Sequence, residues 1–395
     1  MEYQVENGVV TFFIEEDPSH HMFGYPISHP KQLFEPEGPT WLDIGRMAGH
    51  SMQRLPESLH GMKMRAINRK YPNWQEKLRC YNNRSTGRKR INLLALGDVG
   101  GTLLTGLVLL GGDVVQSIGI CDINPQMMRR YELEMNQIAY PWAYEALPAV
   151  EAIEANQLFD CDVFIFCASK GVPPLDTKVQ DVRMAQLKGN AALVREYARQ
   201  ARICGFQGLF AVVSDPVDLL CRCAFIESNR NENGALDFKG LRPEQVQGYG
   251  LGVMNARAAY YAKQEQRFSQ FLREGRAYGP HGQDLVIANS IAHYDDELSR
   301  ELTRLAVEAN LRTRETGFKP YIAPALSSGA ISILLTLRGE WHYSAVPLGG
   351  VYWGCKNRYT PYGVELEQLQ NIPDDLFDRI QQAYGHLQAM DGAWQ

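Results

Sequence analysis

Three glycines and a later aspartate are the residues of this 395-residue chain best placed to bind a phosphate-bearing ligand. Gly97, Gly100 and Gly101 follow an apolar run of strand length, and Asp122 closes a second such run. Glycines let backbone N–H groups and the positive end of a following helix approach a pyrophosphate. An acid about twenty residues further on can accept both ribose hydroxyls, which favours NAD over its 2′-phosphorylated relative. The alternative is a tight turn in an unrelated α/β protein, because Ala95 replaces the first glycine of the usual fingerprint.

Strands and helices must alternate for these residues to meet at one edge of a sheet. The apolar pattern predicts strands at Ile91–Leu96, Val114–Cys121, Asp162–Cys167 and Gly208–Val213. It predicts intervening helices at Thr102–Leu110, Pro125–Gln137, Arg183–Ile203 and Leu219–Ile226. This alternation indicates an α/β protein with a Rossmann-type doubly wound parallel sheet, whose ligands lie at the carboxyl ends of the strands.

The bulk composition is that of an ordinary globular protein, with 45% hydrophobic residues, 22% charged residues and a net charge of −5. Nothing in this balance calls for a nucleic-acid partner. No stretch reaches the roughly 18 apolar residues of a membrane span, and the N-terminus lacks the pattern of a signal peptide. We therefore expect a cytoplasmic protein without a membrane partner, whose eight cysteines are reduced and mostly buried.

Two groups of residues invite a metal interpretation, and neither has the spacing of a metal site. Cys221 and Cys223 are two apart on a predicted helix and so point to different sides. The pair His20 and His21 has no third ligand at a helical or hairpin spacing, which favours a surface loop. We expect no metal.

The chain divides into three parts by sequence: an N-terminal extension of unknown role (1–89), an NAD-binding domain (90–235) and a C-terminal substrate domain (236–395). The extension contains a predicted strand, Val9–Ile14, and a possible short helix, Trp41–Met52. Its basic end, Lys63–Arg90, is interpreted as a solvated linker. The alternative is a segment that grips an anionic ligand or an acidic neighbouring subunit.

With these pieces placed, residues from about 90 to 395 resemble the lactate/malate dehydrogenase family. Five motifs in the family's order carry the resemblance: the glycine turn before Asp122, DVFIFCASKGVPP, VRMAQLKGN, VVSDPVDLL, and GYGLGVMNARAAY followed by GPHGQDL. The resemblance implies a Rossmann domain followed by an α+β catalytic domain, NAD as cofactor, a small carboxylate-bearing substrate and a homo-oligomer, either a dimer or a tetramer.

The resemblance also implies roles for single residues. His281 matches the histidine that exchanges a proton with the substrate oxygen, and Arg257, with Asn255 nearby, matches the group that holds the substrate carboxylate. Arg183 matches the arginine that polarises the reacting carbonyl from a mobile loop, here Ser169–Val182. The positions that match the cofactor site are Gly97, Asp98, Val99, Gly100, Asp122, Ile123, Ala168, Asn190 and Ser214.

Two departures from the family pattern fall on the chemistry. Met254 stands where the family has the aspartate that orients the histidine, and a thioether cannot replace a carboxylate. Asp215 stands where the family usually has an asparagine that donates to the substrate oxygen. Three interpretations of Asp215 are open. It favours an iminium in an imine- or amine-type reaction, it or Asp284 replaces the missing partner of His281, or it caps the helix that begins at Pro216.

Two classes of function therefore remain open from the sequence. The first is an NAD-dependent dehydrogenase acting on a small 2-oxo/2-hydroxy acid or the corresponding imine and amino acid, with His281, Arg183 and Asp215 as catalytic candidates. The second is a catalytically silent dinucleotide-binding sensor or assembly protein. Retention of three separated polar residues, Arg183, Arg257 and His281, favours the enzyme.

Overall fold

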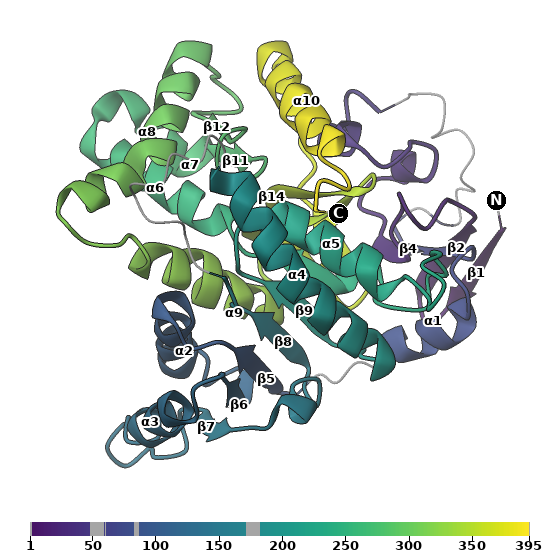
Figure 1. Ribbon diagram of the computed structural model, residues 1–395. Coiled ribbons are helices and arrows are strands. Elements are labelled where there is room, and N and C mark those ends of the chain that lie inside the picture. The colour runs from purple at the N-terminus through teal and green to yellow at the C-terminus, as the bar shows by residue number, and fades with distance from the viewer. Residues whose placement is uncertain (1, 48–58, 60, 83–86, 171–181, 395) are drawn as a thin grey trace.

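A nine-stranded sheet with helices packed against it forms the centre of the molecule (Figure 1). The computed structural model describes residues 2–47, 59, 61–82, 87–170 and 182–394, and only the backbone of residues 182–185. Within these residues the strand order of the large sheet is β15-β14-β13-β10-β9-β8-β5-β6-β7.

One half of this sheet is parallel and doubly wound, as the alternation of apolar runs predicts. Its strands are β5 (Lys89–Leu94), β6 (Val115–Cys121), β7 (Ala149–Ala152), β8 (Val163–Phe166), β9 (Leu209–Val212) and β10 (Val246–Gly248). The neighbouring helices are α2 (Asp98–Leu110), α3 (Pro125–Met135), α4 (Val182–Ile203) and α5 (Val217–Ser228). Every residue of β8 and β9 is buried, because helices cover both faces of a parallel sheet. The predicted Rossmann-type α/β class is confirmed.

The other half of the sheet is antiparallel and belongs to the C-terminal part of the chain. It contains β13 (His342–Leu348), β14 (Val351–Thr360) and β15 (Gly363–Leu366), and β13 pairs with β10. The elements around it are α6 (Leu251–Gln264), α7 (Phe271–Glu274), β11 (Arg276–Tyr278), β12 (Val286–Ala288), α8 (Asp296–Glu315), α9 (Ser332–Arg338) and α10 (Asp374–Ala389). The sheet thus continues across the predicted domain boundary at residue 235, and both domain boundaries stay predictions.

Short helices of other types connect these elements. A π-helix, Pro324–Ile331, precedes α9. The described 3₁₀ helices are Pro30–Leu33, Pro39–Leu42, Ala155–Gln157, Pro243–Gln245 and Gln266–Phe268.

The N-terminal extension is a small folded unit with its own sheet. Strands β1 (Glu2–Glu6), β2 (Val9–Ile14), β4 (Lys63–Asn68) and β3 (Gly24–Pro26) pair in that order, and helix α1 (Trp74–Asn82) follows β4. The predicted strand at Val9–Ile14 is confirmed. The interpretation of the basic segment as a solvated linker is wrong, because β4 lies inside the sheet with Ala66 and Ile67 fully buried.

Two further expectations for the extension need correction. The predicted helix at Trp41–Met52 is wrong within the described residues, since only the 3₁₀ turn Pro39–Leu42 forms, while residues 48–52 lie outside them. The surface-loop interpretation of the histidine pair is confirmed for His20, which is exposed in a turn, but the side chain of His21 is directed inward. Its side chain is 10% exposed, and its Nδ1 lies 2.9 Å from Glu37 Oε1.

The described residues contain no group of three metal-ligating side chains, and among them no helix is long and apolar enough to cross a membrane. All eight cysteines are free thiols. Six are buried or partly buried, as expected, whereas Cys80 and Cys204 are exposed.

A buried carboxylate joins the extension to the C-terminal part of the chain. Asp43 is fully buried, and its two oxygens accept hydrogen bonds from the backbone N–H groups of Asn371 and Ile372, at 2.9 and 2.8 Å. Asp43 also accepts from Gly45 N–H and lies 3.2 Å from Arg46 Nε. These contacts fix the chain just before α10 against the extension.

Replacement of Asp43 by alanine should therefore lower the free energy of unfolding of the whole chain by about 2–3 kcal/mol, since it leaves buried N–H groups without an acceptor. Asp374→Ala is the matched control, because that carboxylate is 89% exposed and pairs with the same Arg46. Its expected loss is below about 1 kcal/mol. Equal denaturant midpoints for the two variants would contradict the coupling of the extension to the core.

Candidate functional site

The glycine turn between β5 and α2 is tightly packed at one glycine and open at another. Ala95 has a φ of 76°, a left-handed conformation that explains why glycine is usual at this position. A Cβ on Gly100 would lie 2.0 Å from the carbonyl oxygen of Ala95, so only glycine fits there. A Cβ on Gly97 would meet nothing within 4 Å. The turn therefore leaves space for a ligand in front of Gly97, at the N-terminus of α2.

Asp122 is held beside this turn by backbone hydrogen bonds. Its Oδ2 accepts from the N–H of Leu96 at 2.7 Å, and its Oδ1 accepts from the N–H of Asn124 at 2.9 Å. Ile123 next to it is fully exposed. The open face of Gly97, the start of α2 and the carboxylate of Asp122 thus lie at one edge of the sheet, as a bound dinucleotide requires.

The second half of the site is a carboxylate–imidazole pair. Asp215 follows the end of β9, and His281 lies in the turn after β11. His281 Nδ1 and Asp215 Oδ1 are 3.2 Å apart, and their side chains are 22% and 50% exposed. Gly250, the N-cap residue of α6, packs closely against the histidine, because a Cβ on Gly250 would lie 3.0 Å from His281 Cβ.

Two buried polar residues hold the backbone around Asp215. Asn190 on α4 donates from Nδ2 to the carbonyl of Asp215 at 2.7 Å and accepts from the N–H of Lys170 at 3.0 Å. Ser214 donates to the carbonyl of Ala168 at 2.8 Å. Asn190 and Ser214 therefore fix the ends of β8 and β9 relative to each other. The cofactor contacts of Ala168, Asn190 and Ser214 stay predictions.

Arg257 and Met254 lie one turn apart on α6. Arg257 Nη1 is 3.4 Å from Met254 Sδ and 3.5 Å from the carbonyl oxygen of Ala306. Burial lowers the pKa of the Arg257 guanidinium, while Tyr261 and Asp215 act in the opposite direction. Met254 itself is 1% exposed within an apolar cluster. The position that carries an aspartate in the resembling family is thus apolar, and the carboxylate near both His281 and Arg257 is Asp215.

The structure bears on two of the three interpretations of Asp215, and the iminium interpretation stays a prediction. The cap interpretation is wrong, because the N-cap of α5 is Pro216 and no side chain caps this helix. The structure pairs Asp284 with His386, whose Nδ1 lies 3.1 Å from Asp284 Oδ1, and not with His281. The arrangement matches the interpretation in which Asp215 is the partner of His281.

Other predicted site residues are placed only in part. Arg183 lies in the first turn of α4, but its side chain and most of the predicted loop Ser169–Val182 lie outside the described residues. Asn255 is partly exposed on α6, between Met254 and Arg257. Val99 is partly buried in the first turn of α2.

One contact at this site was missed from the sequence. Lys319 Nζ lies 3.1 Å from Asp98 Oδ2, and so joins the C-terminal half to the glycine turn across 221 positions of sequence. No local pattern marks such a pair. It also gives Asp98 a cationic neighbour beside a turn that is suited to phosphates.

Comparison with known proteins supports the resemblance to the lactate/malate dehydrogenase family. The L-lactate dehydrogenase of Mesomycoplasma hyopneumoniae (strain 232) is 24% identical over 290 residues, which cover 66% of this chain and 85% of that protein. The L-lactate dehydrogenase of Streptococcus equinus is 25% identical over 169 residues, 43% of this chain and 46% of that protein. No protein-family model matches the chain.

Solved structures of the same kind share the fold. The minor L-lactate dehydrogenase of Enterococcus mundtii has a TM-score of 0.61 at 19% identity, covering 77% of this chain and 98% of that one. The malate dehydrogenase of Archaeoglobus fulgidus, in complex with NADH, has a TM-score of 0.59 at 16% identity, covering 76% and 97%. The fold and the resemblance predicted from the motifs are confirmed.

The two glycines of the turn should respond differently to the same substitution. Gly100→Ala forces a Cβ against the carbonyl of Ala95, so we expect it to lower the free energy of unfolding by about 3 kcal/mol. Gly97→Ala, at a φ of −65° and in open space, should change it by less than about 0.5 kcal/mol. Thermal or denaturant unfolding of both variants checks this, and a stable Gly100→Ala protein would contradict the described turn.

Proposed function

We propose that this chain, a divergent relative of the lactate and malate dehydrogenases, is an NAD-dependent dehydrogenase of a small carboxylate-bearing substrate. The observation that carries the proposal is the pairing of His281 with Asp215 near Arg257, beyond the carboxyl ends of the sheet strands. A catalytically silent protein has no need for a carboxylate that compensates the loss of another. The homologues support dehydrogenase chemistry in general, and the substrate and cofactor assignments are ours.

The residues around Gly97 fit a nicotinamide dinucleotide. The open face of Gly97 admits a pyrophosphate to the N-terminus of α2, where no side chain caps the helix. Asp122, already oriented by Leu96 and Asn124, presents a carboxylate that suits two ribose hydroxyls and repels a 2′-phosphate. NAD would supply or accept the hydride. By the same resemblance Asp98, Val99 and Ile123 border this ligand.

His281 transfers the proton in this mechanism. Its Nδ1 donates to Asp215, which fixes the tautomer and directs Nε2 to the substrate oxygen. When the substrate is oxidised, the imidazole takes the hydroxyl proton and becomes a cation, and the Asp215 carboxylate stabilises that cation. Asp215 thereby performs the task of the aspartate that Met254 replaces.

Arg257 binds and orients the substrate. Its planar guanidinium can hold a carboxylate through two parallel hydrogen bonds, and its partial burial strengthens them by excluding water. Asn255 and Arg183 complete the site, with Arg183 carried on the first turn of α4. The lid role of the segment from Ser169 to Val182 belongs to this proposal as well. We further propose a cytoplasmic homo-oligomer, a dimer or a tetramer.

The first experiment mixes the purified protein with NADH and a panel of 2-oxo acids, with and without ammonium. We expect loss of NADH absorbance with at least one 2-oxo acid in the absence of ammonium, because Asp215 is engaged with His281. Turnover that requires ammonium would instead support the imine reaction. NADH binding without turnover in any condition would contradict the enzyme and support the silent binder.

The second experiment replaces Asp215 by asparagine, the residue that the dehydrogenase family usually has there. As the partner of the catalytic imidazole, Asp215 should be needed for kcat, so we expect a fall of about a hundredfold to ten-thousandfold with NADH affinity retained. A carboxylate that had merely replaced a substrate-binding asparagine would give the opposite sign, an increase in kcat. Asp160→Asn, on an exposed residue, is the control for the chemical change.

A further inference from the structure

Lys319 reaches from the C-terminal part of the chain to the start of α2. Its Nζ lies 3.1 Å from Oδ2 of Asp98, and the two residues are 221 positions apart in the sequence. Asp98 is the first residue of α2 and directly follows Gly97. The ion pair therefore lies at the turn where the proposed function puts the dinucleotide phosphates, and it joins two distant parts of the chain there.

The backbone that carries Lys319 is anchored against α2. The Tyr321 N–H donates to the carbonyl of Lys319 at 3.1 Å, and the Ala325 N–H donates to the carbonyl of Tyr321 at 3.0 Å. The π-helix that follows packs closely on α2, because a Cβ on Gly106 would lie 2.6 Å from Ala330 Cβ. Figure 1 shows this part of the chain, which continues into α9, beside α2. The position of Lys319 relative to α2 is therefore set by packing as well as by the ion pair.

The carboxylate of Asp98 opposes the binding of an anion at this helix start. The N-terminus of a helix attracts phosphate through its backbone N–H groups and its dipole. Asp98 places a negative charge in the same first turn, where it repels a diphosphate. Lys319 supplies the opposite charge, since its Nζ contacts that carboxylate. While the pair is formed its two charges cancel, and the partial positive charge of the helix start remains available to the ligand.

Both members of the pair are open to solvent. The side chain of Lys319 is 82% exposed and that of Asp98 is 51% exposed. An exposed ion pair contributes little to the free energy of unfolding, usually less than about 1 kcal/mol. A lysine ammonium has three N–H donors on a flexible stem, so it can contact Asp98 and a phosphate oxygen together. The pair is therefore better suited to binding a ligand than to stabilising the fold.

We propose that Lys319 is a cofactor-positioning residue, which neutralises Asp98 and binds the diphosphate of the dinucleotide from the C-terminal side. The inference rests on the proposed function, because it takes the diphosphate to lie in front of Gly97. It adds a charged contact that the glycine turn alone does not provide. A diphosphate held between Lys319 and α2 links the turn to the part of the chain that carries Arg257 and His281.

The test is a calorimetric titration of the full chain, at low ionic strength, with ADP-ribose, which carries the diphosphate and lacks the nicotinamide. We expect Lys319→Gln to weaken binding about three- to tenfold, because it leaves the charge of Asp98 uncompensated. Asp98→Asn should not weaken binding, since it removes the repulsion and leaves Lys319 to the ligand. Lys319→Arg should retain most of the affinity. Lys263→Gln, on an exposed lysine in the last turn of α6, is the matched control and should bind as the wild-type protein does.

Salt separates a charge effect from a change of shape. Raising the ionic strength from about 0.01 M to about 1 M should remove most of the difference between Lys319→Gln and the control, because the Debye length falls to about 3 Å. Equal weakening by Lys319→Gln and Asp98→Asn is the result of a purely structural ion pair and would overturn the proposal. Equal affinities of Lys319→Gln and Lys263→Gln would overturn it as well, with the proposed function intact. A wild-type protein that binds neither ADP-ribose nor NADH would contradict the proposed cofactor site itself, and this inference with it.

Discussion

The hydrogen bond between the Asp215 carboxylate and the His281 imidazole joins the parallel part of the sheet to the C-terminal part of the chain at the candidate site. Asp215 comes from the end of a parallel strand, and His281 comes from a loop of the C-terminal part. The other polar contacts around the site keep this bond in place. Asn190 donates a hydrogen bond to the carbonyl of Asp215, and the close packing of Gly250 against His281 restricts the position of the histidine.

Asp215 lies close to the His281 imidazole and acts on the Arg257 guanidinium. Residue 254, one turn before Arg257 on α6, is a methionine that is 1% exposed within an apolar cluster. Under the proposed function the carboxylate beside the histidine therefore comes from Asp215 and not from residue 254.

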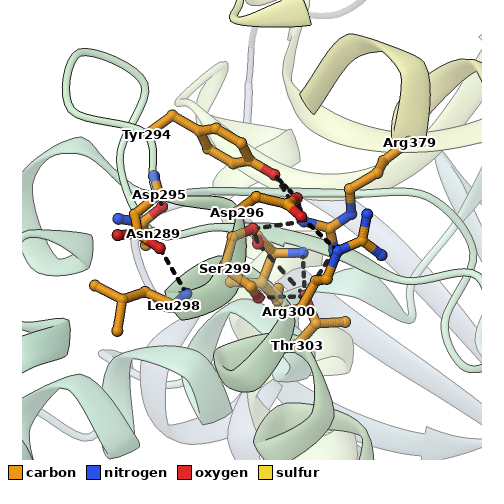
Figure 2. Close-up of polar contacts among 10 residues, drawn as sticks. Asn289, Tyr294, Asp295, Asp296, Leu298, Ser299, Arg300, Thr303 and Arg379 are labelled. Atoms are coloured by element: carbon orange, nitrogen blue, oxygen red, sulfur yellow. Dashed lines mark hydrogen bonds and ion pairs between the residues drawn. The ribbon is translucent and has the colours of Figure 1, made fainter. Parts of the chain in front are cut away.

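Local pattern was enough to predict β5, α2, β6 and the position of Asp122, because a strand, a glycine turn and a helix are specified by neighbouring residues. The partner of His281 could not be chosen from the sequence, since Asp215 and Asp284 both lie in motifs that carry the resemblance. Three-dimensional packing places Asp215, and not Asp284, beside His281. Packing also buries the Asp43 carboxylate between the extension and the segment before α10. The hydrogen bonds that hold Arg379 join side chains about 80 residues apart, which no spacing rule connects (Figure 2).

The tautomer of His281 tests the central claim most directly. In protein labelled with ¹⁵N at histidine, the ring nitrogen shifts show which atom carries the proton of the neutral imidazole. The account predicts a proton on Nδ1, directed to Asp215, and a changed ring signal in Asp215→Asn. A proton on Nε2 in the wild-type protein, or identical His281 signals in the two proteins, would contradict it.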